Sequence, residues 1–263
     1  MIKILRVEWI KTKRTMLREV LILSPVIFSL YAFWQVSKRP LDDEIIKNVF
    51  LIRSLFFKFF LPLLVSFISS YIIGYEDIYG NNVYINNRTS KIYFCLGKIL
   101  SSFIYMVWIL MVMDLIYIFS LKFLYINFPY KILFFSSIMA LLGILPVIVL
   151  HVFVTFKWGM GISGALGLVG TLLSAIVTAG LGSKIWFLFP WAIPSMLNLY
   201  CIVFLDNIKV TEELTKLLTQ YSPFQIYLSS SLNGIIASIV YFVIFLSIGL
   251  YWFKRWEGRS CCD

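Results

Sequence analysis

Residues 132–154 read ILFFSSIMALLGILPVIVLHVFV and contain no Asp, Glu, Lys or Arg. A helix needs about 20 predominantly apolar residues to cross the hydrocarbon core of a bilayer, so this stretch is long enough to span a membrane. Lys131 and Lys157 lie just outside its two ends. The stretch therefore predicts an integral membrane protein.

The composition of the whole chain supports the same class. Of its 263 residues, 60% are hydrophobic and 14% are charged, and the mean hydropathy is +0.90. Average soluble proteins carry about 25% charged residues. The net charge of +10 would suggest a nucleic-acid partner in a soluble protein. In a membrane protein, basic residues retained in the cytoplasm explain this charge, so we expect no nucleic-acid partner.

Five further apolar segments lie outward from residues 132–154 along the chain. We therefore predict an all-α integral membrane protein that forms a single domain over residues 1–263. Its six transmembrane helices are expected at residues 20–36, 55–73, 99–123, 132–154, 162–179 and 228–253. Arg53 and Lys58 lie near the outer end of the second span, where we expect them to reach the lipid headgroups by snorkelling.

The first 18 residues, MIKILRVEWIKTKRTMLR, alternate apolar and basic positions. Ile2, Leu5, Trp9 and Ile10 can share one helical face, and the bases lie mostly elsewhere. This pattern predicts an interfacial amphipathic helix at residues 1–18, lying on an anionic inner leaflet. No small-residue cleavage site follows the first apolar run, which argues against a signal peptide.

Residues 185–205 are apolar but include Pro190 and Pro194. Each proline would cost about 3 kcal/mol or more inside a regular helix, so a seventh continuous span is unfavourable. We predict instead a re-entrant segment of short helices that dips into the outer leaflet, because irregular backbone is tolerated at that depth only where protein covers it.

Charge counting gives the expected orientation. The predicted inner segments hold 13 of the 23 Lys and Arg residues, and the clearly outer segments hold six. This bias predicts a multi-pass protein of the cell membrane with both termini in the cytoplasm.

Residues 74–98, GYEDIYGNNVYINNRTSKIYFCLGK, are the only long polar interruption between two spans on the predicted inner side. We expect this segment, with residues 75–98 as a cytosolic loop, to be where the protein meets a soluble partner.

The fifth span carries small residues at every fourth position, which places them on one helical face. A second row (Gly170, Ser174 and Thr178) lies beside the first, which consists of Gly159, Ser163, Gly167, Thr171, Ala175 and Ala179. Small residues allow close approach of two helices. The row predicts either packing within one subunit or a subunit interface that lines a transport path.

Asp114 is the one acidic residue deep in an apolar span, and it has no evident basic partner in the sequence. Such residues often act as proton relays or substrate contacts. Alternatively, Asp114 is neutral or accepts hydrogen bonds from a neighbouring Ser or Tyr. His151 is the only histidine, and we interpret it as a residue of the packed interior.

The sequence offers no catalytic site. A zinc site needs about four ligands, and Cys95, Cys201, Cys261 and Cys262 show no ligand spacing, so we expect free thiols and no metal. No serine is marked as a partner of His151, and no phosphate-binding loop is present. We expect a protein that is not an enzyme and that takes any energy from a partner.

The chain resembles the ABC-2-type permeases. The resemblance rests on Leu5–Arg14 (LRVEWIKTKR), on Leu61-Pro62-Leu63 followed by Glu76, and on the Asn/Gly-rich loop with Arg88 and Lys91 to Lys98. The fifth span followed by Trp186–Pro194 (WFLFPWAIP) resembles more narrowly the lantibiotic-immunity permeases of the MutE/EpiE and MutG type.

The resemblance implies a permease subunit that expels a lantibiotic or other bacteriocin peptide from the membrane. It would pair with a second permease, as a heterodimer, and with two copies of a cytosolic ATPase, which would bind ATP and Mg²⁺; this chain would bind no cofactor. The small row (Gly159, Ser163, Gly167, Thr171 and Ala175) would be the subunit interface. The residues that would dock on the ATPase are Tyr75, Glu76, Asp77, Tyr79, Gly80, Asn81 and Arg88.

Two other functions remain open at this point. The chain could be a membrane sensor or scaffold that transports nothing and passes a signal to a kinase. It could also be an ion-coupled transporter that uses Asp114.

Overall fold

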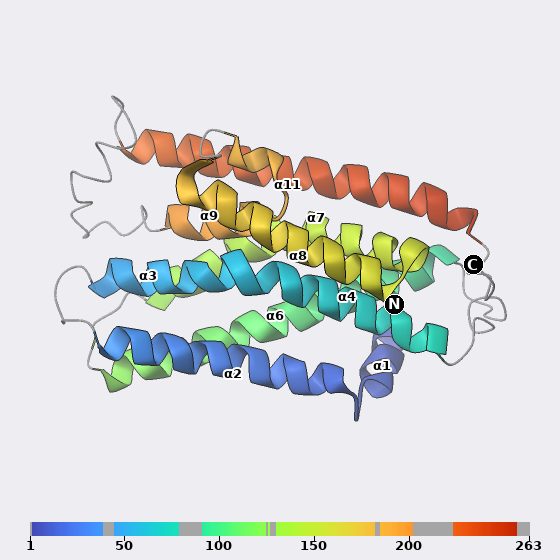
Figure 1. Cartoon of the computed structure of the whole chain (residues 1–263), viewed down its shortest axis with the longest axis horizontal. Helices are drawn as coiled ribbons and strands as arrows, with labels where there is room; N and C mark the ends of the chain where they lie inside the picture. Colours follow the sequence, from blue (N-terminus) through green and yellow to red (C-terminus); the bar gives the residue numbers. More distant parts are fainter. Residues whose placement is uncertain are drawn as a thin grey trace.

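The computed structural model describes residues 2–38, 45–78, 91–124, 126, 130–181, 185–201 and 223–256. In that part of the chain every regular element is a helix, and there is no strand. Six of the helices are long and apolar enough to cross a membrane, and they lie side by side as a bundle (Figure 1). The prediction of an all-α protein with six such helices is confirmed, and it indicates a multi-pass membrane protein.

The candidate spans extend beyond most ends of the predicted apolar segments. α6, for example, begins at Lys91 rather than at residue 99. Backbone hydrogen bonds do not depend on side-chain hydropathy, so a helix can continue past the apolar core. The spans are Met16–Ser37 (α2), Asn48–Gly74 (within α3, η1 and α4), Lys91–Phe123 (α6), Tyr130–Trp158 (α7), Met160–Leu181 (α8, Met160–Ile176, and η2, Val177–Leu181) and Ser230–Lys254 (within α11, Pro223–Lys254).

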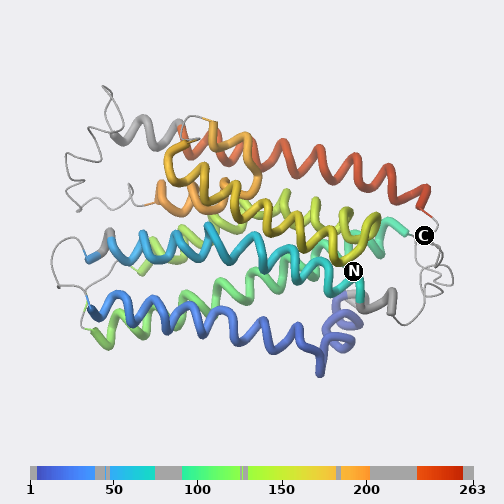
Figure 2. The backbone as a smooth tube through the Cα atoms, in the orientation of Figure 1, coloured from blue at the N-terminus to red at the C-terminus, as the bar shows by residue number. Residues whose placement is uncertain are grey.

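The second span is built from three consecutive elements: α3 (Ile45–Leu55), the π-helical turn η1 (Phe56–Phe60) and α4 (Leu61–Ile78). Figure 2 shows them as one continuous path along the bundle. In η1 the rings of Phe56 and Phe60 stack with centroids 6.2 Å apart, and Phe28 of α2 lies 4.9 Å from Phe56. A π-turn widens a helix locally without ending it, so α3 brings Arg53 into the span.

α1 (Ile2–Lys11) is a short helix that lies across one end of the bundle. Residues 12–15 turn the chain into α2, and Arg14 adopts a positive φ of 109° in this turn. The last turn of α11 lies at the same end, as do the last turn of α4 and the first turn of α6 (Figure 1). We call this end the α1 end.

The face of α1 that packs against the protein includes a charged residue. Glu8 is buried, whereas Val7, Trp9 and Ile10 are exposed. Val7, Trp9 and Ile10 therefore face outward, where a bilayer would contact them, and the charged side chain of Glu8 faces inward.

Between the fifth and sixth spans, the described residues 185–201 form short helices. They are η3 (Trp186–Leu188) and α9 (Ile193–Tyr200), joined by the turn at residues 189–192. A Cβ atom placed on Gly143, near the middle of α7, would lie 2.9 Å from the backbone nitrogen of Pro194. The start of α9 therefore lies about halfway along the bundle.

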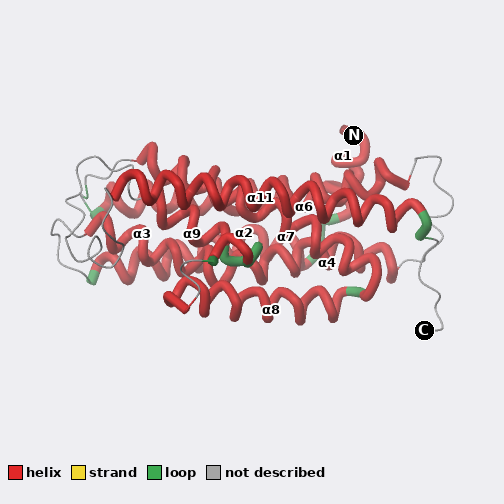
Figure 3. The backbone as a smooth tube through the Cα atoms, turned by 90° about the horizontal axis from the view of Figure 1, so that it is seen from above, coloured by secondary structure: helices red, strands yellow, loops and turns green. Residues whose placement is uncertain are grey.

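The core lies along the second span and α7, which are the most enclosed of the six candidate spans. α8 flanks them at the edge seen in Figure 3. α11 has the most exposed surface of the six, and most of its exposed side chains between residues 230 and 254 are apolar. This distribution suits a bundle that is surrounded by lipid.

Candidate functional site

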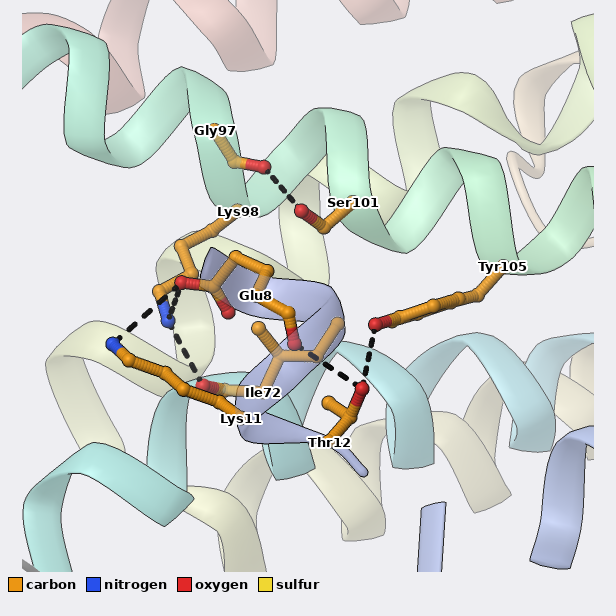
Figure 4. Close-up of polar contacts among 8 residues, drawn as sticks. All are labelled: Glu8, Lys11, Thr12, Ile72, Gly97, Lys98, Ser101 and Tyr105. Atoms are coloured by element: carbon orange, nitrogen blue, oxygen red, sulfur yellow. Dashed lines mark hydrogen bonds and ion pairs between the residues drawn. The ribbon is translucent and has the colours of Figure 1, made fainter. Parts of the chain in front are cut away.

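A buried ion pair joins α1 to the bundle at the α1 end. The Nζ atom of Lys98 in α6 lies 2.9 Å from Oε1 of Glu8, and both side chains are almost fully enclosed. Lys98 also donates a hydrogen bond of 3.1 Å to the backbone oxygen of Ile72 in α4 (Figure 4). Lys11 lies farther from Glu8, at 3.9 Å, and is partly exposed. One lysine thus connects α1, α4 and α6.

Further contacts of α1 lie beside this ion pair. The hydroxyl groups of Thr12 and Tyr105 are 3.0 Å apart, and Thr12 also donates to the backbone oxygen of Glu8 (Figure 4). The guanidinium of Arg18 in α2 lies 4.4 Å from the ring centroid of Trp9 and donates to the Trp9 backbone oxygen. α1 is therefore fixed to both α6 and α2.

Burial makes the Glu8–Lys98 pair sensitive to the loss of either member. Two ions that are removed from water lose the free energy of hydration. Their mutual attraction can offset this loss only while both ions are present. Lys98 was expected on the inner side, and no role was predicted for Glu8. The available indication was that Glu8 is the only acidic residue among the first 18.

The predicted docking residues lie at or beyond the last turn of α4. Tyr75, Glu76 and Asp77 are part of the helical backbone of α4, which ends at Ile78. The others, Tyr79, Gly80, Asn81 and Arg88, lie outside the residues that the structure describes. After this gap the chain resumes in α6 at Lys91, whose Nζ donates a 2.7 Å hydrogen bond to the backbone oxygen of Trp256, just beyond α11.

Asp114 has a basic partner, contrary to the interpretation from the sequence. Its Oδ1 atom lies 2.7 Å from Nη1 of Arg53, and its Oδ2 atom accepts a 2.7 Å hydrogen bond from Ser137. Arg53 also donates to Ser137 Oγ and, at 3.2 Å, to the backbone oxygen of Leu133. This cluster joins α3, α6 and α7.

The expectation that Arg53 reaches the lipid headgroups is therefore wrong. Arg53 is fully buried. The helical register of α3 turns it toward the core, where the carboxylate replaces the lost hydration. Two opposite charges isolated in different apolar spans could have indicated the pairing, because such residues usually pair with one another.

The small-residue row of α8 is occupied by contacts within this subunit. A Cβ atom on Gly167 would overlap Oγ and Cβ of Ser66 in α4. Ser163, Gly167 and Thr171 are buried, and Ala175 is partly buried. Gly159 adopts a φ of 93° in the one-residue turn between α7 and α8. Contacts within the subunit therefore account for Ser163, Gly167 and Thr171, whereas Ala179 at the end of the row is exposed.

His151 of α7 has a serine beside it, although no serine was expected there. Its Nδ1 atom lies 3.0 Å from Oγ of Ser163 in α8, and both residues are fully buried. On the other side of the ring, Nε1 of Trp191 lies 3.4 Å from Nε2 of His151. The two residues lie only 12 positions apart, on either side of the α7–α8 turn, and this short connection was the available indication.

No group of three or more His, Cys, Asp or Glu residues that could hold a metal ion occurs in the described part of the chain. Cys95 and Cys201 are buried free thiols, and Cys261 and Cys262 lie outside the described residues. Comparisons with protein-family models, curated proteins and solved structures found no match for this chain.

Proposed function

We propose that the chain is the membrane permease subunit of an ATP-driven exporter of the ABC-2 type, and that it expels a lantibiotic or related bacteriocin peptide from the cell membrane. The observation that carries this proposal is the connection made by Lys98. It ties α1 to the two helices, α4 and α6, that border the polar segment expected to meet a soluble partner.

The contacts at the α1 end suit mechanical coupling. A partner that moves the segment between α4 and α6 would displace Lys98, and with it Glu8 and α1. The same movement would reach α11 through the Lys91–Trp256 hydrogen bond. A charged contact inside a protein transmits such movement because separating its members is costly.

The positions of exposed basic residues support an orientation with the α1 end in the cytoplasm. Arg6, Lys13, Arg14, Lys157 and Lys254 are exposed near the α1 end, which would therefore face the cytoplasm. α1 would lie in the inner interface with Trp9 and Ile10 toward lipid. Residues 185–201 would re-enter the bundle from the outer side.

A second permease subunit would bind the outward face of α8 rather than its small-residue row. That face is exposed and apolar, and it includes Leu168, Val169 and Leu172. Two copies of a cytosolic ATPase would supply the ATP hydrolysis and would dock on residues 75–88.

The proposal is tested by replacing Glu76–Asn82 with a Gly/Ser linker of equal length in the tagged full chain. We expect the variant to lose co-purification with an ATP-hydrolysing subunit from host membranes. The matched control replaces Asp206–Glu212, a segment that the charge count predicts to lie on the outer side, and should keep the partner. Retention of the ATPase by the first variant would refute the docking assignment.

Transport itself needs a second measurement. Vesicles that contain the copurified assembly should move a fluorescent lantibiotic out of the bilayer only when ATP is supplied. Binding of an ATPase or a kinase without peptide movement would favour the sensor alternative. Peptide movement that follows a proton gradient without ATP, and that Asp114→Asn abolishes, would favour the ion-coupled alternative.

A further inference from the structure

His151, Ser163 and Trp191 form a polar cluster that the export function does not use. The cluster joins three parts of the chain: α7, α8 and the turn before α9. The His151 and Trp191 rings meet edge to face, with centroids 6.5 Å apart and an interplanar angle of 75°. Thr155 holds the same region by donating a 2.6 Å hydrogen bond to the His151 backbone oxygen.

The partners of the imidazole determine which nitrogen carries the proton. An indole N–H can only donate a hydrogen bond, so Nε2 of His151 must offer a lone pair to Trp191. In a neutral imidazole the proton then lies on Nδ1, which donates to Ser163 Oγ. An imidazolium would carry hydrogen on both nitrogens and would place two donors against each other at Trp191.

This proton arrangement bears on what Ser163 can do. A serine nucleophile needs an adjacent base with a free lone pair that accepts the hydroxyl proton. The nitrogen that faces Ser163 is the protonated one, so His151 cannot serve as that base. The geometry of the pair resembles a catalytic dyad only in its distance.

The position of Trp191 depends on a second contact. The indole lies against Gly170 near the middle of α8, and a Cβ atom at position 170 would overlap its Cδ1, Nε1 and Cγ atoms. The indole of Trp191 thus packs against Gly170 on one side, and its N–H points to His151. The adjoining Pro194 packs on Gly143 of α7.

We propose that His151 is a positioning residue, fixed as the Nδ1–H tautomer between Ser163 and Trp191, that holds the turn at residues 189–192 inside the helix bundle. The chain contains a single histidine, so imidazole nitrogen signals from ¹⁵N-histidine-labelled protein come from this residue alone.

The test is a nitrogen NMR spectrum of the full chain in lipid nanodiscs. We expect one protonated Nδ1 signal and one unprotonated Nε2 signal, identified by the coupling of each nitrogen to the ring protons. Trp191→Phe keeps most of the volume over Gly170 but removes the donor, so it should shift the Nε2 signal and allow the second tautomer to appear. An Nε2–H tautomer or an imidazolium in the unaltered protein would overturn the proposal.

A matched glycine pair provides the second variant. Gly170→Ala should displace Trp191 and change the Nε2 signal, whereas Gly164→Ala has no neighbour within 4 Å and should leave it unchanged. Equal spectra for the two variants would contradict the assigned contact.

The position of the turn is measured by thiol accessibility. A cysteine at the buried position Ala192 should react with a water-soluble reagent about fivefold faster after Trp191→Phe, the change expected from losing one hydrogen bond. An unchanged rate would show that His151 does not position the turn. Labelling of Ser163 by a fluorophosphonate would also overturn the proposal. The reagent reacts only with an activated hydroxyl, and His151 as the Nδ1–H tautomer cannot activate Ser163.

Discussion

Glu8 and Lys98 lie 90 positions apart in the sequence, and their side chains meet at 2.9 Å in an enclosed site between α1 and α6. We expect Lys98→Met to destabilise the protein by about 3–5 kcal/mol, because it leaves the Glu8 carboxylate buried without its counter-ion. Thermal unfolding in detergent would measure the loss.

The double variant Glu8→Leu with Lys98→Met should recover most of this stability, since no buried charge remains. Lys11→Met is the matched control, because Lys11 is partly exposed and its contact with Glu8 is long; we expect a change below about 1 kcal/mol. A double variant as unstable as Lys98→Met would mean that the pair does not determine the stability of this site.

A second prediction concerns Arg53 and Asp114. Asp114→Asn should also cost about 3–5 kcal/mol, because the Arg53 guanidinium keeps its charge in a fully buried position. Arg53→Met combined with Asp114→Leu should fold well and retain peptide export. If the double variant folds but loses export, Asp114 takes part in transport beyond its pairing with Arg53.

A third prediction concerns the close contact between α8 and α4 at Gly167. Gly167→Leu should destabilise the monomer by several kcal/mol, since its side chain would overlap Ser66. Gly164 lies on the same helix with open space around it, so Gly164→Leu should be tolerated. Unfolding measured before any partner is added distinguishes this effect from failed assembly. Equal stabilities of the two variants would contradict the α4–α8 contact.

The fourth prediction tests orientation. In a chain freed of its four native cysteines, a cysteine that replaces Arg14 should react with an impermeant thiol reagent only from the cytoplasmic side. A cysteine at Thr211 should react only from the outside. Labelling of both positions from the same side would refute the proposed arrangement of the spans.

The sequence predicted the six apolar helices because each one satisfies its backbone hydrogen bonds internally and must meet lipid with apolar side chains. It did not predict the partner of Asp114. Arg53 lies 61 positions earlier, and the hydropathy pattern placed it at the end of a helix, near the headgroups. The pattern does not show that the helical register of α3 turns its side chain toward Asp114. The sequence also did not show which helix packs against Gly167, because a small residue allows close contact with α4 and with another subunit equally well.

The burial of Glu8 has a consequence for the order of assembly. Lys98 is synthesised 90 residues after Glu8, so α1 cannot complete its docking until α6 has entered the bundle. Until then Glu8 lacks its Lys98 partner, and α1 is held by its contact with Arg18 of α2 and by the lipid surface. Formation of the ion pair would therefore mark the point at which the first three spanning segments have reached their final places.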